Sequence, residues 1–324
     1  MVREGAADMA NSNSPKVSVI IPCYNAEKTI EACIGGLMAQ EYPSVEIIVI
    51  DDDSRDGTST ILKKLTGIQL IKNAKNEGPA SSRNKGISAS SGEIILLIDS
   101  DCLIENRDLI TKHVLAHRDP SVHIVGGGVK GVGKGIVAKA DNYSHWFLNI
   151  PHSVNKVVPQ LVTNNMSVKR YVFEKLKGFN ERLRTGEDTD FCERAHKVGY
   201  RMHLRTDAIV KHCDREKFKD FIKNFYLAGR DRVPARRLEK HRYWFLLPFN
   251  RVSSLIYCFP QAFILSLQVV CAWFRYDKMV IFSFPLIFAG RLAMTVGVID
   301  YFFNNVSKGK GHHRKKSTHK AGHS

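Results

Sequence analysis

Four mainly apolar runs near the start of the chain constrain its fold most strongly. They occupy residues 17–21, 45–50, 68–73 and 93–98. Between the first two runs, apolar residues recur at helical spacing: Ile30, Ile34, Leu37 and Met38. Thr58 or Ser59 then suits the N-cap of a short helix, and Pro79 the first turn of another. Strands that alternate with helices predict an α/β fold with a parallel sheet, whose ligands bind beyond the carboxyl ends of the strands.

Acidic residues follow two of these runs at the predicted carboxyl ends. Three consecutive aspartates come directly after residue 50, and Asp99 and Asp101 come directly after residue 98. Alternate residues of an extended segment point the same way, so Asp99 and Asp101 can face one ligand. Mg²⁺ or Mn²⁺ bound to a diphosphate suits such a pair, because these ions use one or two protein carboxylates plus substrate oxygens. A cation or a donor-rich ligand is therefore expected at this edge.

The overall charge is strongly basic, with 48 Lys and Arg against 32 Asp and Glu and a formal net charge of +16. This balance suits nucleic acid, an anionic membrane surface or phosphorylated substrates. Seven cysteines without a CxxC pair indicate neither a disulfide framework nor a zinc site, and favour a reducing compartment. Residues 1–15 have no apolar core, which predicts a disordered leader and no signal peptide.

Five motifs connect the strand ends to a known family. The segments VSVIIPCYNAEKTI, VIDDDSRDGT, NEGPASSRNKGI, LLIDSD and GEDTDFCERAHKVGY occur in this order. Together they resemble inverting glycosyltransferases of the family-2 type, from about Val17 to His212. The resemblance implies a GT-A-type, Rossmann-like nucleotide-sugar-binding domain over residues 16–228. It also implies a nucleotide-sugar donor and Mg²⁺ or Mn²⁺ as the cofactor.

The resemblance assigns donor-binding roles at the first two strand ends. Pro22 and Tyr24 match the turn that lies along the nucleoside. Asp52 matches the acid that accepts a hydrogen bond from the base. Asp51 and Asp53 are left to orient the turn.

A second group of residues matches the family's diphosphate and metal positions. Arg83 matches a basic residue that faces the diphosphate, although a solvated helix face is the alternative. Asp99 and Asp101 match the DxD pair that binds the donor and its metal, with Asp101 in direct contact with the ion. His212 sits where relatives have a histidine near the cation, or else is a loop histidine. A divalent ion there would stabilise the charge of the leaving diphosphate.

The catalytic residues are expected in the segment GEDTD. Asp188 matches the general base that takes a proton from the acceptor hydroxyl, with Glu187 beside it. The alternative is that Asp188 is the N-cap of the helix that follows. That helix is expected to turn Phe191, Ala195 and Val198 inward.

Two further segments were considered for ligand contacts. Residues 163–170 resemble the segment that lines the acceptor and donor-sugar side, where Asn164 and Asn165 either bind sugar hydroxyls or are turn asparagines. Residues 128–134 fit GxxxxGK, but Gly135 stands where a P-loop needs Ser or Thr. We therefore interpret them as a flexible connection flanking the acceptor site. No QxxRW signature is present, so processive synthesis is not expected.

The C-terminal part predicts a helical membrane hairpin over residues 249–303. Residues 252–274 carry no charge and are long enough to cross a bilayer. Residues 279–298 are also apolar but contain Arg291, which is costly within a membrane unless it is paired. The two helices are therefore expected to be transmembrane or re-entrant. A buried hairpin of a soluble domain is the alternative.

Basic segments flank this hairpin. Residues 229–248 form a predicted juxtamembrane segment and residues 304–324 a basic tail. Positive charge on both outer ends places the domain and the tail in the cytoplasm, against anionic membrane lipids. Nucleic acid is not expected as a partner, because the chain shows no fold signal or aromatic platform for it.

The sequence thus favours a membrane-anchored, metal-dependent inverting glycosyltransferase at the cytoplasmic face of the cell membrane. Its expected acceptor is a hydroxyl of a lipid-linked saccharide or of a growing surface glycan. The alternatives are an enzyme that loads a sugar onto polyprenyl phosphate, a nucleotidyltransferase, and a non-catalytic descendant of the fold.

Overall fold

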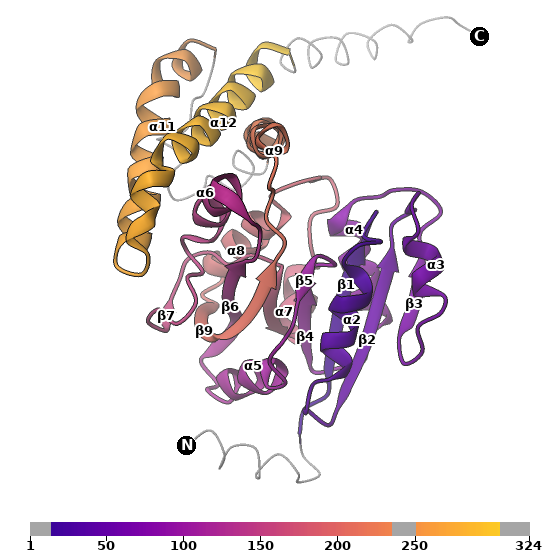
Figure 1. Ribbon diagram of the computed structural model, residues 1–324. Coiled ribbons are helices and arrows are strands. Elements are labelled where there is room, and N and C mark those ends of the chain that lie inside the picture. The colour runs from indigo at the N-terminus through magenta and orange to yellow at the C-terminus, as the bar shows by residue number, and fades with distance from the viewer. Residues whose placement is uncertain (1–13, 235–250, 305–324) are drawn as a thin grey trace, which may run out of the picture.

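The computed structural model describes residues 14–234 and 251–304. Its centre is a nine-stranded mixed sheet in the order β3-β2-β1-β4-β8-β6-β9-β5, with β7 paired to β9 (Figure 1). The strands are β1 (Val17–Cys23), β2 (Val45–Asp51), β3 (Gln69–Lys72), β4 (Ile94–Ile98), β5 (Cys102–Leu103), β6 (Val122–Gly131), β7 (Lys156–Val157), β8 (Asn165–Lys169) and β9 (Arg201–His212).

The predicted parallel pairing is confirmed for the first four strands, and β6 and β9 are also parallel, whereas β5, β7 and β8 pair antiparallel with their neighbours. β1 pairs in parallel with β2 and β4, and β2 with β3. β8 runs antiparallel between β4 and β6. The sequence of β8 shows no apolar run, because Asn165 and Ser167 face the interior. There they form hydrogen bonds with the histidines of α5 (Leu109–His117).

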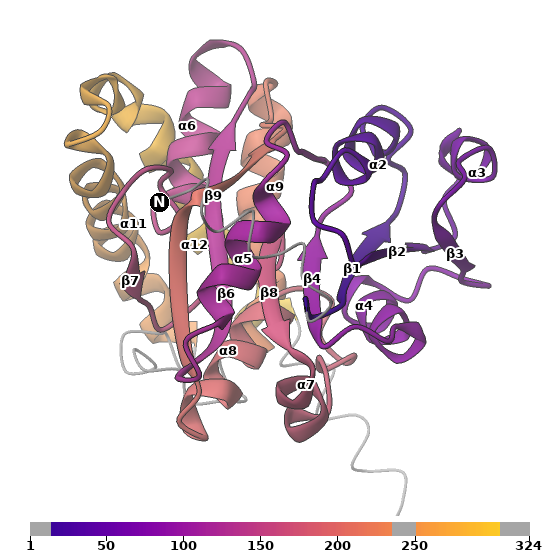
Figure 2. The same ribbon diagram turned by 90° about the horizontal axis from the view of Figure 1, so that it is seen from below.

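Helices cover both faces of the sheet, as alternating side chains of a buried strand require. Val19 and Ile21 of β1 pack toward α2 (Ile30–Met38), α5 and α6 (Gly135–Trp146). Ile20 packs toward α4 (Pro79–Ala89), α7 (Arg170–Leu176) and α8 (Glu187–Lys197). Figure 2, a view from below, shows α2 and α4 on opposite sides of β1 and β2.

Four local predictions are corrected. The N-cap of α3 (Thr58–Leu62) is Gly57, and the Thr58 hydroxyl instead donates to Asp56 Oδ1 at 2.5 Å. Met38 and Val198 are exposed, because α2 buries Cys33 and α8 buries Cys192 in their place. Residues 128–131 are part of β6 and α6 begins at Gly135, so the predicted flexible connection is largely strand.

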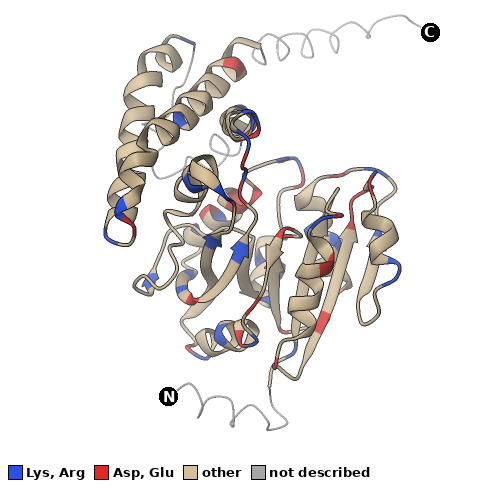
Figure 3. Cartoon of the chain, in the orientation of Figure 1, with Lys and Arg blue, Asp and Glu red and all other residues tan. Residues whose placement is uncertain are grey.

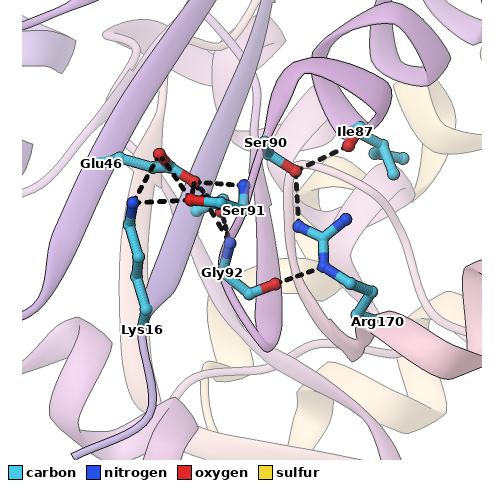
Figure 4. Close-up of polar contacts among 8 residues, drawn as sticks. Lys16, Glu46, Ile87, Ser90, Ser91, Gly92 and Arg170 are labelled. Carbon is cyan, nitrogen blue, oxygen red and sulfur yellow. Dashed lines mark hydrogen bonds and ion pairs between the residues drawn. The ribbon is translucent and has the colours of Figure 1, made fainter.

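A polar cluster closes the amino-terminal end of the sheet, away from the strand ends that carry the acids (Figure 4). The Glu46 carboxylate accepts hydrogen bonds from Ser18 Oγ at 2.5 Å and from the Ser91 amide at 2.7 Å, and it pairs with Lys16. Burial would raise the pKa of Glu46, but these donors lower it to about 2. The Arg170 guanidinium ties the start of α7 to the Gly92 carbonyl at 2.6 Å. Strands β1, β2 and β4 are thus joined at this end.

The C-terminal helices are built onto the domain. They are α9 (Phe218–Asp231), α11 (Arg251–Phe274), the 3₁₀ helix η3 (Lys278–Ser283) and α12 (Phe284–Asn304). The two apolar helices expected in this part are therefore present. Figure 1 shows α12 crossing α9, with α11 on the outside. A Cβ on Gly297 would lie 2.0 Å from the Tyr226 carbonyl oxygen, so α9 and α12 touch backbone to backbone.

The same helices share the main hydrophobic core. Trp273 of α11 and Ile287 of α12 belong to the cluster that includes Tyr143 of α6 and Phe225 of α9. The Trp273 indole donates to the Tyr143 carbonyl at 3.0 Å. The hairpin is therefore docked on the α/β domain. The leader up to residue 13, residues 235–248 of the basic segment, residues 249–250 of the predicted hairpin, and the tail from residue 305 lie outside the described residues.

Candidate active site

A cavity of about 600 Å³ opens at the carboxyl ends of β1, β2 and β4. Eight of the nine predicted site residues line it: Pro22, Tyr24, Asp52, Arg83, Asp99, Asp101, Glu187 and Asp188. The ninth, His212, lies just behind the wall. Residues far apart in the sequence therefore meet in one place.

Arg83 joins the two acidic motifs. Its Nη2 donates to Asp99 Oδ1 at 2.7 Å and its Nη1 to Glu187 Oε1 at 2.6 Å. The guanidinium is buried, which alone would lower the pKa of Arg83, but the charges of Asp99 and Glu187 raise it. The solvated-helix alternative is thus wrong. Arg83 contacts the carboxylates that surround the expected diphosphate.

Glu187 and Asp188 have different environments although they are neighbours. Glu187 is buried against Arg83, and burial together with the charge of Asp188 raises its pKa, against the influence of Arg83. Asp188 is half-buried and lines the cavity, and its Oδ1 accepts from the Thr189 amide at 2.7 Å. The N-cap of α8 is Gly186, so Asp188 is not the cap. Asp188 is therefore the better placed of the two to meet a substrate hydroxyl.

Asp99, Asp101 and His212 form the candidate cation side of the cavity. His212 is the last residue of β9 and not a loop residue, and its Nε2 lies 3.3 Å from Asp101 Oδ2. Burial would raise the pKa of Asp101, but the hydrogen bond from His212 lowers it. The same contact raises the pKa of His212 against the effect of burial.

The donor set fits a divalent cation that is shared with a diphosphate. Asp99 gives one oxygen to Arg83 and Asp101 gives one to His212, which leaves one carboxylate oxygen on each for a metal. No cluster of three or more His, Cys, Asp or Glu suited to a metal occurs among residues 14–234 and 251–304. Such a pair matches Mg²⁺ or Mn²⁺, which keep few protein ligands and complete their shell with phosphate oxygens and water.

Asp52 has a role that its motif did not indicate. Its Oδ1 accepts from the Glu77 amide at 2.9 Å and from Asn73 Nδ2 at 2.7 Å, and its Oδ2 accepts from the Gly78 amide at 2.8 Å. Asp52 therefore holds the loop that leads into α4 and Arg83. One lone pair of Oδ2 is left for the predicted contact with a base. Asp51 orients its own turn by accepting from the Ser54 amide at 3.0 Å.

The asparagine segment behaves differently from the prediction. Thr163 lines the cavity, but Asn164 and Asn165 do not. Asn165 is fully buried, bonds to His113 Nε2 at 2.9 Å and donates to the Ala208 carbonyl at 2.9 Å. The predicted contact of Asn165 with a sugar hydroxyl is therefore wrong, because its side-chain amide is hydrogen-bonded within the core.

The far wall of the cavity carries basic residues that motif reasoning missed. Arg232 and Arg291 line it together with Leu265 of α11 and Met294 of α12, whereas Arg184 lines the cavity from the segment just before α8. Arg291 was singled out only as a costly charge in an apolar segment. Its Nη2 donates to the Ser144 carbonyl at 2.9 Å, so the charge faces the domain.

The sequence resembles known proteins. Residues 18–177 match the model of glycosyl transferase family 2. Glycosyltransferase AglE from Haloferax volcanii is 28% identical over 255 residues, which cover 74% of this chain and 82% of that protein. The Escherichia coli UDP-Glc:alpha-D-GlcNAc-diphosphoundecaprenol beta-1,3-glucosyltransferase WfgD is 40% identical over 87 residues, 26% of this chain and 34% of that protein.

A solved structure shows the same fold. Mannosyltransferase PcManGT from Pyrobaculum calidifontis, in complex with GDP-Man and Mn²⁺, superposes with a TM-score of 0.62 at 17% identity. The match covers 90% of this chain and 88% of that one. Residues 18–177 thus form a glycosyl transferase family 2 domain, and the chain is a glycosyltransferase with a GT-A fold.

Proposed function

We propose that this glycosyltransferase moves a sugar from a nucleotide-sugar donor to a hydroxyl of a lipid-linked saccharide, with inversion at the anomeric carbon. One observation carries the proposal: the Asp99–Asp101 pair and Asp188 line the same cavity, with Arg83 between the two motifs. WfgD is named for a diphosphoundecaprenol-linked acceptor and PcManGT was solved with GDP-Man, and both support these substrate classes.

The reaction is a single displacement. Asp188 takes the proton of the acceptor hydroxyl, whose oxygen then bonds to the anomeric carbon from the side opposite the diphosphate. The bond from that carbon to the diphosphate breaks, and its electron pair stays on the departing oxygen. Asp99 and Asp101 would hold Mg²⁺ or Mn²⁺, which supplies Lewis-acid stabilisation of the diphosphate charge when it is bound. Arg83 keeps Asp99 in place and adds positive charge beside the leaving group.

The hairpin provides the membrane attachment in this proposal. α11 and α12 are long and apolar enough to cross a bilayer. Figure 3 shows both almost free of charged residues, whereas α9 beside them carries Lys, Arg and Asp. An exposed apolar stripe runs along α11 through Val252, Leu255, Ile256, Phe259, Phe263 and Leu267.

The packing of α12 argues that the hairpin lies in the membrane surface. Because α12 touches α9 at Gly297, a spanning α12 would draw Lys223, Arg230 and Asp231 of α9 into hydrocarbon, which is costly. We therefore propose that α11 contacts lipid at the cytoplasmic face while α12 stays on the domain.

The experiment that tests the function is a panel of nucleotide sugars added to the full chain in detergent. One UDP- or GDP-sugar is expected to raise the thermal unfolding temperature in the presence of Mn²⁺, and EDTA should remove that shift. A chain that no nucleotide sugar stabilises, with or without metal, would contradict the donor assignment.

A further inference from the structure

Arg291 brings a positive charge from the membrane hairpin to the wall of the active-site cavity. It is the only Lys or Arg of α12, and it is buried. Its guanidinium carbon lies 5.6 Å from the centre of the Phe225 ring and 5.7 Å from that of Phe147. These rings and the Ser144 carbonyl hold the side chain against the cavity. We therefore expect the charge of Arg291 to act on a ligand in the cavity and not to stabilise the apolar helix.

The cavity has two electrostatic ends. Asp99, Asp101 and Asp188 lie on the domain side, where Arg83 pairs with two carboxylates and Arg184 donates to Asn76 Oδ1 at 3.5 Å. Arg232, directly after α9, and Arg291 line the hairpin side. A second phosphate-bearing substrate would be repelled by the carboxylates and attracted by these guanidiniums, which bind phosphate with several charge-assisted hydrogen bonds.

The wall beside these arginines is apolar, and α11 contributes to it from a different face than its exposed stripe. Leu265 of α11 and Met294 of α12 line the cavity next to Arg291. Phe259 and Phe263 are exposed on the same helix as Leu265. A ligand that combines a phosphate with a long apolar chain would satisfy both features at once.

We propose that Arg291 and Arg232 bind the phosphate of a lipid-linked acceptor, whose apolar chain follows α11 toward the membrane and whose saccharide reaches Asp188. The inference rests on the proposed function and names the chemistry of the acceptor side. The hairpin is thereby part of the substrate site as well as an attachment to the membrane.

The test uses the full chain in detergent and farnesyl diphosphate as the probe, measured by calorimetry beside its uncharged counterpart farnesol. Arg291→Gln is expected to weaken farnesyl diphosphate binding about tenfold or more, because one charge-assisted contact is lost. Arg291→Lys should retain part of the affinity. Arg275→Gln is the matched control: it removes an exposed arginine from the same hairpin and should change nothing.

The outcomes separate the possible roles of Arg291. If Arg291→Gln weakens binding of UDP or GDP with Mn²⁺ as strongly as that of farnesyl diphosphate, the arginine serves the donor and the inference is wrong. If farnesol binding falls equally, the effect is loss of the apolar wall, and the inference is again wrong. Arg232→Gln, on a less buried residue, provides the same comparison should Arg291→Gln fail to fold.

The wild-type chain separates this inference from the proposed function. Nucleotide binding without farnesyl diphosphate binding would overturn the acceptor site alone. A chain that binds no nucleotide at all would overturn the proposed function instead.

Discussion

At the scale of single residues, the site depends on Arg83. This guanidinium is buried and is held between Asp99, after β4, and Glu187, at the start of α8. Burying charges is favourable only when each has a partner of good geometry, so the three side chains form one unit. This contact ties the turn of Asp99 and Asp101 to the start of α8.

Arg83→Met should destabilise the protein by about 3–5 kcal/mol, because it leaves Glu187 buried without its partner. Urea unfolding measures this change. Arg107→Met is the control, since Arg107 is exposed and its pair with Glu41 spans 4.0 Å, and it should change stability by less than about 0.5 kcal/mol. An equal effect of the two substitutions would show that the buried bridge does not stabilise the fold.

The sequence predicted which residues meet at the site better than it predicted what they do there. Asp52 belongs to a recognisable motif, but two of its three donors are the backbone amides of Glu77 and Gly78, and every residue except proline supplies such an amide. Asn165 was open between a sugar contact and a turn role, because nothing in its segment reveals the carbonyls of Gly128 and Ala208 or the His113 ring that bond to it. Motifs identify side chains, whereas hydrogen-bond partners follow only from the packed structure.

At the scale of elements, a polar cluster joins α5 to β8. Ser167 Oγ lies 2.8 Å from His113 Nδ1 and 2.8 Å from His117 Nε2. Burial lowers the pKa of His113 to about 4 and that of His117 to about 3. Both histidines are therefore neutral in the folded protein at pH values where the unfolded chain is already protonated.

Stability should consequently fall as the pH drops from about 6.5 toward 4, because the unfolded chain then binds more protons than the folded one. Each histidine contributes roughly 1.4 kcal/mol per pH unit in that window. Urea unfolding at pH 6.5 and pH 5.0 measures the slope, and the double variant His113→Gln, His117→Gln should show a shallower one. Identical slopes would mean that the histidines do not titrate on unfolding in this range.

The contact between α9 and α12 is the second element that can be tested. Gly297→Leu would push a side chain into the Tyr226 carbonyl and should separate α12 from the domain. Hydrogen exchange of residues 284–304 is expected to become faster, with weaker farnesyl diphosphate binding. Gly35→Leu is the matched control, because a Cβ on that exposed helical glycine meets nothing within 4 Å. Unchanged protection of α12 in Gly297→Leu would contradict the docked hairpin.

At the scale of the whole molecule, the sheet and the hairpin differ in how far the sequence predicts them. The first four strands and their acidic ends follow from apolar runs and spacing. The position of the hairpin does not follow from the sequence. An apolar run predicts that a helix is buried, but not which surface it packs against. Arg291 and the glycine contact reveal only in the structure that α12 packs on the catalytic body.

Membrane attachment should depend on the outer face of α11. The double variant Phe259→Asp, Phe263→Asp is expected to bind vesicles of phosphatidylglycerol and phosphatidylcholine at least tenfold more weakly. The reason is that two aromatic side chains no longer insert into the lipid. Tyr171→Asp alters an exposed aromatic of α7 and serves as the control. Alkaline carbonate should release the wild-type chain from these vesicles. Retention after carbonate would contradict a hairpin that lies in the membrane surface.

The central claim is that Asp188 is the general base of a glycosyl transfer in the cavity it shares with Asp99 and Asp101. The most direct measurement is the transfer rate of Asp188→Asn, together with its affinity for the donor. We expect the rate to fall by about 10²–10⁴ while donor affinity stays unchanged. Asp53→Asn, at a turn residue with φ of 62° that asparagine tolerates, should remain near wild type. Transfer by Asp188→Asn at close to the wild-type rate would contradict the account.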